Sequence, residues 1–104
     1  MKDRTILEEY IRFTYLALEN DDVEYISIRW PEDFMPDDFL VEFEQFYERE
    51  NNRFGHLFKL VADYFDSKSH GFDSSVGKSI EEYRRELIDY LEYFVHREDL
   101  KIKV

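Results

Sequence analysis

The stretch from Ser79 to Phe94, SIEEYRRELIDYLEYF, carries the clearest structural signal in the sequence. Ser79 and Glu82 have the spacing of a capping box, in which the two side chains satisfy backbone amides at the start of a helix. Large apolar residues then recur at intervals of three and four, which places them on one helical face: Ile80, Tyr83, Leu87, Leu91 and Phe94. The stretch therefore predicts a helix that begins after Ser79 and ends near His96.

Residues 5–18 predict a second helix. Thr5 and Glu8 again have capping-box spacing, and apolar residues follow at helical intervals up to Leu18. The polar run from Asn20 to Asp22 is typical of a turn that ends such a helix. The apolar face is broad, which indicates that this helix is largely buried.

The segment between Pro36 and Phe65 predicts further helical structure. Pro36 suits a first helical turn, because its ring fixes φ near the helical value. An apolar stripe then runs from Phe39 to Phe65 with a helical period, and Phe39, Phe43 and Phe46 within it are expected in the core. Asn51, Asn52 and Gly55 weaken the middle of the segment. It is therefore either one kinked helix or two helices.

Residues 23–30, VEYISIRW, have an ambiguous pattern. Ile26, Ile28 and Trp30 alternate with polar residues, as in a strand, but only the tail LKIKV at 100–104 could pair with it. A lone strand would leave its backbone hydrogen-bonding groups unsatisfied. We therefore predict a single domain over residues 1–104 that is mostly all-α, and we leave open a short strand-like segment near 23–30.

The stretch GFDSSVGKS at residues 71–79 nearly matches the loop that cradles phosphates in many NTPases. That loop needs four residues between its glycines, whereas five separate Gly71 from Gly77. The loop should also follow a buried strand, yet LFKLVADYF at 57–65 has a helical period. We interpret the stretch as an ordinary loop that leads into the helix after Ser79, without a nucleotide.

The sequence offers little for catalysis or metal binding. It has no cysteine, which excludes disulfides and cysteine-ligated zinc. Its three histidines are His56, His70 and His96, and Glu92 is spaced to share a helical face with His96, but a metal site usually needs three converging ligands. No nucleophile motif occurs either. We therefore expect no enzyme activity, catalytic residue, metal or cofactor.

Negative charge is concentrated in one third of the chain. The formal net charge is −11, and residues 19–50 hold twelve acidic and two basic residues, a net charge of −10. This field repels nucleic acid and anionic membranes and attracts basic partners, although it could also serve solubility alone. Candidate partner-binding residues are eight of these acids together with Trp30, which is either core or interface: Asp21, Asp22, Glu24, Trp30, Glu32, Asp33, Asp37, Asp38 and Glu42.

One half of the chain resembles a known family. The segment RFGHLFKLVADYF at 53–65, a polar loop and SIEEYRRELIDYLEYF at 79–94 together resemble the small immunity proteins of bacterial toxin systems, in particular the helical colicin D-type family. The resemblance covers residues 53–94 and is a pattern of apolar spacing around a loop, whereas VEYISIRWPEDF at 23–34 departs from it. It implies a four-helix bundle that binds one cognate toxin domain, often a tRNA-cleaving nuclease, and blocks its active site. No binding residue can be carried over from it.

Charge and resemblance together suggest a function in protein binding. The leading hypothesis is an immunity or inhibitor protein that neutralises a basic nuclease toxin domain through its acidic surface. The alternatives are a phage-type nucleic-acid mimic that inhibits a DNA- or RNA-binding machine, and an acidic adaptor domain. The start MKDRTILEEY has no apolar core of signal-peptide length, and no run approaches the ~20 apolar residues of a membrane helix. We therefore expect a cytoplasmic protein that is a monomer or a small homo-oligomer.

Overall fold

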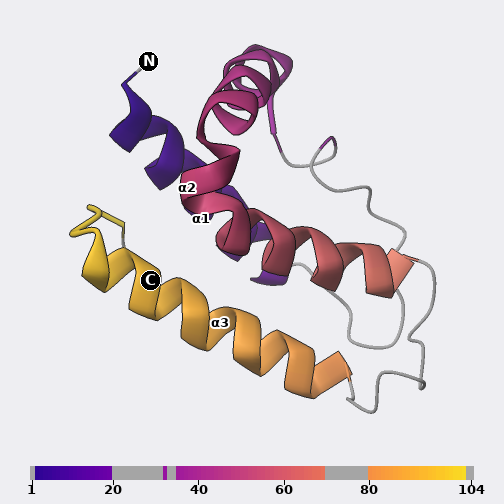
Figure 1. The fold of residues 1–104 in the computed structure, drawn as a ribbon. Coiled ribbons are helices and arrows are strands. Elements are labelled where there is room, and N and C mark those ends of the chain that lie inside the picture. The colour runs from indigo at the N-terminus through magenta and orange to yellow at the C-terminus, as the bar shows by residue number, and fades with distance from the viewer. Residues whose placement is uncertain (1, 20–31, 33–34, 70–79, 103–104) are drawn as a thin grey trace.

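The regular structure of the protein is helical (Figure 1). A computed structural model describes residues 2–19, 32, 35–69 and 80–102. Within these ranges the chain forms three helices and no strand: α1 (Asp3–Glu19), α2 (Asp37–Ser69) and α3 (Ile80–Arg97). The all-α prediction is confirmed, while four separate helices are not found in the described part of the chain. The ambiguous segment at 23–30 lies outside the described residues.

The second helix bends sharply at Phe54 (Figure 1). Phe54 has φ −116° and ψ 17°, away from the helical values that its neighbours keep. A straight helix of 33 residues would be about 50 Å long, which exceeds the 39 Å longest dimension of the molecule. The segment therefore consists of two helical arms that meet at a kink at Phe54, and together they form α2. We call residues 37–53 the first arm and residues 55–69 the second arm.

The first arm and α1 form an antiparallel pair. The ring of Tyr10 stacks on that of Phe43 with 4.7 Å between centroids, and Phe13 lies 5.4 Å from Phe39. At the other end of the pair, Arg49 donates a hydrogen bond to the Asp3 carboxylate. Residue numbers in α1 rise from 3 to 13 while those of their contacts in α2 fall from 49 to 39. The two helices therefore run in opposite directions. We call this pair the first hairpin.

The second arm and α3 form another antiparallel pair, and they lie side by side in Figure 1. Phe54 meets Phe94 edge to face at 5.8 Å, and His56 meets Tyr90 in the same way at 4.9 Å. We call this pair the second hairpin. The fold is thus two helical hairpins that share α2, which is kinked at Phe54.

The hydrophobic core is continuous across both hairpins. Phe58 of the second arm lies within 5.0–6.2 Å of four rings of the first hairpin: Tyr10, Phe43, Phe46 and Tyr47. Leu57 and Leu91 are fully buried beside this cluster. Phe39 and Phe46 are buried and Phe43 is half-buried against the core, which confirms the core placement of these residues. Each large side chain buried in this way contributes about 1.5–3 kcal/mol.

The predicted capping box at the start of α1 is wrong. The helix already begins at Asp3, and the Lys2 carbonyl accepts the amide of Ile6, so that Thr5 lies inside the first turn. The Glu8 carboxylate instead accepts the backbone amide of Lys101 in the C-terminal tail. The carboxylate that the sequence pattern assigned to the helix cap therefore accepts a hydrogen bond from the C-terminal tail instead.

The starts of the other two helices agree more closely with the sequence. The Pro36 carbonyl accepts the amide of Leu40 at 2.9 Å, so that Pro36 directly precedes the first turn of α2. The third helix begins at Ile80, the position expected after Ser79, while Ser79 itself lies outside the described residues. The second helix continues to Ser69, a few residues beyond the end that its apolar pattern predicts.

The third helix ends in a Schellman motif. The amide of Leu100 donates to the carbonyl of Val95 at 3.0 Å, and the amide of Asp99 donates to the carbonyl of His96 at 3.2 Å. Such an end requires a left-handed residue, and Asp99 supplies it with φ 52°. Arg4 of α1 donates to the Asp99 carbonyl, which attaches this turn to the start of the chain.

Replacing Asp99 with glycine is expected to raise the free energy of unfolding by about 0.5–1 kcal/mol, because glycine adopts a positive φ without a Cβ clash. The Asp99 carboxylate lies 4.0 Å from Arg4 and is 83% exposed, so its loss costs little. Urea titration followed by circular dichroism measures the change. The matched control Asp89→Gly, at an exposed position inside α3, should instead lower stability by roughly 0.5 kcal/mol. If both variants lose stability, the glycine-like role of Asp99 is wrong.

Candidate functional site

The solvent side of the first arm carries a row of acids. Four carboxylates occupy one helical face, since positions 37, 44 and 48 repeat at helical intervals and position 38 lies beside them. All four side chains are exposed, and so are the two other residues of this face, Val41 and Gln45. We call this surface the outer face, and its members are Asp37, Asp38, Val41, Glu44, Gln45 and Glu48. It extends about 16 Å along the helix.

The nearby bases are engaged elsewhere. Arg49 bonds to Asp3 and lies 3.6 Å from Glu50, so that it faces α1 rather than the outer face. Arg12 pairs with Glu9, and Lys59 pairs with Asp63 at 2.7 Å. Within the part of the chain that the structure describes, no ion pair reaches the four carboxylates of the outer face. Their negative charge is therefore uncompensated there.

The helix itself favours two of these acids. Asp37 and Asp38 lie in the first turn of α2, where unpaired backbone amides give the helix end a partial positive charge. Glu44 and Glu48 lie further along the arm, beyond the reach of this effect. The first pair thus has a structural reason to be acidic, whereas the second pair has none within the described part of the chain.

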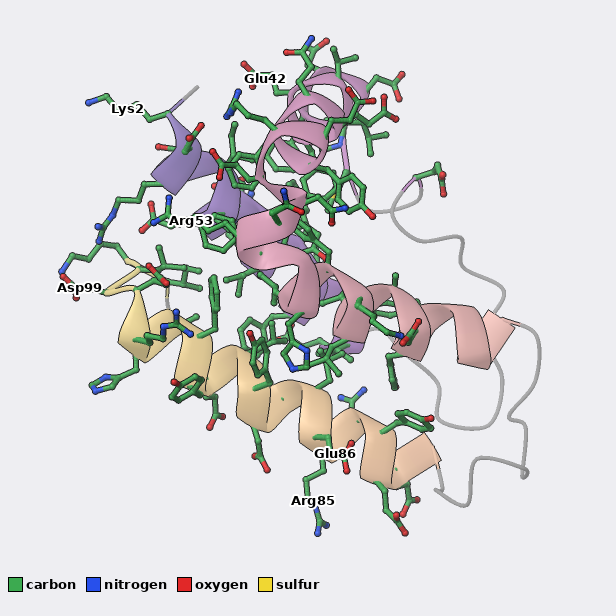
Figure 2. All side chains as sticks on the ribbon, in the orientation of Figure 1. Lys2, Glu42, Arg53, Arg85, Glu86 and Asp99 are labelled. Atoms are coloured by element: carbon green, nitrogen blue, oxygen red, sulfur yellow. The ribbon has the colours of Figure 1, made fainter. Side chains whose placement is uncertain are left out.

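An apolar side chain lies among the acids. Val41 is 57% exposed in the middle of the outer face, and Tyr47, 41% exposed, lies toward one edge of the arm. Packing accounts for Tyr47, because its ring contacts Phe43 and Phe58. It does not account for Val41. In Figure 2, carboxylate oxygens surround this arm near the labelled Glu42.

The structure brings together only part of the predicted partner-binding set. Asp37 and Asp38 belong to the outer face, and Glu32 is exposed in a turn shortly before α2. Glu42 is half-buried on the flank of the arm and lies off the outer face. The remaining members lie outside the described residues: Asp21, Asp22, Glu24, Trp30 and Asp33.

The prediction from sequence missed Glu44 and Glu48. Both are exposed members of the outer face. The spacing 37, 41, 44 and 48 is visible in the sequence, but it does not show by itself which side of the helix faces solvent. Centring the stripe on Phe39 and Phe46, which are the most deeply buried residues of this arm, would have found them.

A cavity of about 220 Å³ lies elsewhere, where the bend of α2 meets the start of α1 and the turn after α3. The buried Leu7, Phe54 and Leu100 line it together with charged residues, including Arg4 and Arg53. Figure 2 shows Arg53 beside the bend. Arg4 already bonds to the Asp99 carbonyl, and the guanidinium of Arg53 lies 4.8 Å above the ring of Phe54. These contacts hold the helix ends together around the cavity.

Burial raises the pKa of Tyr90 and, more strongly, the pKa values of Tyr10 and Tyr15. Burial raises the pKa of the Tyr10 phenol far above its ordinary value, and the nearby Tyr47 raises it further. Burial, assisted by the negative charge of Glu92, raises the pKa of Tyr15 to about 12. Both phenols are therefore neutral at physiological pH and cannot act there as bases.

The described residues show no other site of recognisable chemistry. No three histidine, aspartate or glutamate side chains among them lie close enough to hold a metal ion. None of the three described helices is long and apolar enough to span a membrane. The nucleotide-like stretch at 71–79 lies outside the described residues.

Comparison with protein-family models, with characterised proteins and with solved structures finds no match to this chain. The resemblance to helical immunity proteins therefore stays a prediction from the pattern of residues 53–94.

Proposed function

We propose that the protein is an inhibitor of the immunity-protein kind, which binds a basic nuclease toxin domain with the outer face of the first arm of α2. The observation that carries this proposal is the set of four exposed carboxylates that no ion pair within the described residues neutralises. Uncompensated acids on one rigid helix attract a surface rich in lysine and arginine. Glu32, exposed nearby in the sequence, would extend this surface.

Inhibition would follow from what a nuclease requires. Its substrate groove carries lysine and arginine side chains that bind phosphates. Carboxylates placed in or beside that groove compete with the nucleic acid, and long-range attraction accelerates the encounter. The inhibitor itself would perform no chemistry and would need no metal or cofactor.

Val41 favours a toxin inhibitor over a nucleic-acid mimic. A mimic is expected to spread carboxylates over a face at phosphate-like spacing, whereas the outer face has an exposed apolar side chain among its acids. Protein interfaces are typically built with an apolar centre and a polar rim. Val41 would bury its methyl groups against the partner while the surrounding acids pair with its basic residues.

The proposed family would also account for the helix count. The α1 helix, the two arms of α2 and α3 would supply the four helical segments of a colicin D-type bundle. In this proposal the protein is bacterial and cytoplasmic, where it would meet the toxin as a monomer or a small homo-oligomer.

The first experiment is capture of the partner. The tagged protein is incubated with extract of its own source cells at low salt, the partner is eluted with high salt, and mass spectrometry identifies it. We expect one basic nuclease fragment whose RNA- or DNA-cleaving activity disappears when the purified protein is added. Capture of a polymerase or another nucleic-acid machine would instead favour the mimic. A captured nuclease that stays fully active would contradict inhibition.

Reversing the charge of Glu44 and Glu48 to lysine is expected to slow association with that partner roughly tenfold or more at low salt. The rate should also lose most of its dependence on salt concentration, since the steering charge is gone. Surface plasmon resonance over a salt series measures both effects. The matched control reverses two exposed acids of α3, Glu81 and Asp89, which changes the net charge equally. Equal slowing by both double variants would show that the outer face is not the site.

A further inference from the structure

The two hairpins are joined by the backbone at a single point. The chain passes once from the first hairpin to the second, and it does so inside α2, at the kink residue Phe54. Each hairpin is local in sequence and has its own internal contacts, such as Tyr10 with Phe43 in the first and His56 with Tyr90 in the second. The backbone conformation at Phe54 therefore sets whether the two hairpins of one chain can meet.

The contacts between the hairpins depend on this kink. Residues 43 and 58 are about 22 Å apart along a straight helix, yet the rings of Phe43 and Phe58 lie 5.7 Å apart. The stacking of Phe46 on Phe54, at 5.9 Å, would likewise be lost if the two arms were collinear. A continuous α2 would therefore separate the two hairpins of one chain.

We propose that a second copy of this chain can restore these contacts, so that the protein also forms a domain-swapped dimer in which α2 is one continuous helix. In this dimer the first hairpin of each copy packs on the second hairpin of the other. The rings of Tyr10, Phe43, Phe46 and Tyr47 then meet Phe58 of the partner copy, and Arg4 meets the partner copy's Asp99. Such an exchange is a low-cost route to a dimer, because the contacts are those of the monomer.

The side chain of Phe54 influences the equilibrium between the monomer and the swapped dimer. Its ring is 5% exposed and packs on Phe46 of the first arm and on Phe94 of α3. The contact with Phe94 lies within the second hairpin and is kept when α2 is continuous, whereas the contact with Phe46 needs the kink. Within α2, Phe54 is the residue whose φ and ψ depart from helical values, so that Arg53 and Gly55 beside it already have helical backbone. A change at Phe54 alone would therefore make the helix continuous.

The distance between the two arms tests the exchange directly. The chain has no cysteine, so spin labels attach only to cysteines that are introduced. We introduce them as Val41→Cys and Ala62→Cys, at exposed positions on the two arms. The labelled chain is mixed with excess unlabelled chain, refolded at millimolar concentration and separated by size. Pulsed electron resonance should give about 31 Å along a continuous helix in the dimer, and a shorter distance in the monomer.

The control pair lies within the second hairpin. Labels at Ala62→Cys and Tyr93→Cys, both exposed, should report the same distance in monomer and dimer. A dimer whose arms keep the monomer distance would show association through the surface and would overturn the exchange. The absence of any dimer after refolding at millimolar concentration would overturn it as well.

Substitution at the kink should shift the equilibrium. Leucine is a better helix former than phenylalanine and cannot stack on Phe46, so Phe54→Leu is expected to raise the ratio of dimer to monomer roughly threefold. Phe65→Leu removes a comparably buried ring from the second arm away from the kink, and should leave the ratio unchanged. Analytical ultracentrifugation measures both. Equal ratios in the two variants would contradict control by Phe54.

Discussion

Replacing Phe46 with alanine is expected to lower the free energy of unfolding by about 3–5 kcal/mol. Phe46 is fully buried, and its ring contacts Phe54 at 5.9 Å and Phe58 at 6.2 Å. It therefore joins the first arm both to the kink and to the second arm. Removal of the ring deletes apolar contact and leaves a cavity, because neighbours on both arms of α2 cannot all move inward.

Chemical denaturation followed by circular dichroism at 222 nm measures this loss. Val41→Ala is the matched control on the same arm, since its side chain is 57% exposed, and it should change stability by no more than about 0.5 kcal/mol. A loss below 1 kcal/mol at Phe46 would mean that the two arms are not packed against each other through this ring.

The protein is expected to lose stability steeply as the pH rises above 10. Tyr10 and Tyr15 have raised pKa values in the folded protein because burial disfavours the phenolate. In the unfolded chain both phenols ionise near pH 10. Between that pH and the folded pKa the unfolded chain binds fewer protons, so each further pH unit favours unfolding. The stability due to these groups is thus complete below pH 10 and falls above it.

The fully buried Tyr10 should contribute about 1.4 kcal/mol of lost stability per pH unit in this range. Tyr15 should add a smaller total loss, because its pKa is raised only to about 12 and its contribution ends near that pH. Urea titrations at several pH values between 8 and 12 measure the slope. Tyr10→Phe should flatten it, while the exposed Tyr93→Phe should not. An unchanged slope in Tyr10→Phe would contradict the burial of this phenol.

The outer face and the kink lie on the same helix, which links the two proposals physically. A domain-swapped dimer would display two copies of the outer face, each on its own first arm. Two such faces at fixed separation could engage two basic surfaces, and a bivalent partner would gain effective concentration from this arrangement. The monomer presents one copy of the face and would bind a single toxin domain.

The candidate site was only partly predictable. Composition showed that the excess negative charge lies in residues 19–50, and two of the candidate residues, Asp37 and Asp38, are exposed at the start of α2. Glu42 lies off the outer face and Glu44 and Glu48 were missed, since the orientation of a helix about its axis depends on what it packs against. Likewise, no local pattern could show that Arg49 turns toward Asp3 of α1 and leaves the outer face without a base.

The sequence by itself determined the helical class and the extent of each described helix to within a few residues, because apolar spacing and turn residues act locally. Tertiary structure decided the rest. Asn51, Asn52 and Gly55 only weaken the middle of α2, and the bend at Phe54 brings its ring against Phe46 of the first arm. The hydrogen bonds from the Lys101 amide to Glu8 and from Arg49 to Asp3 also join segments that are distant in the chain. Such contacts depend on the packing of whole helices, which no short stretch of sequence encodes.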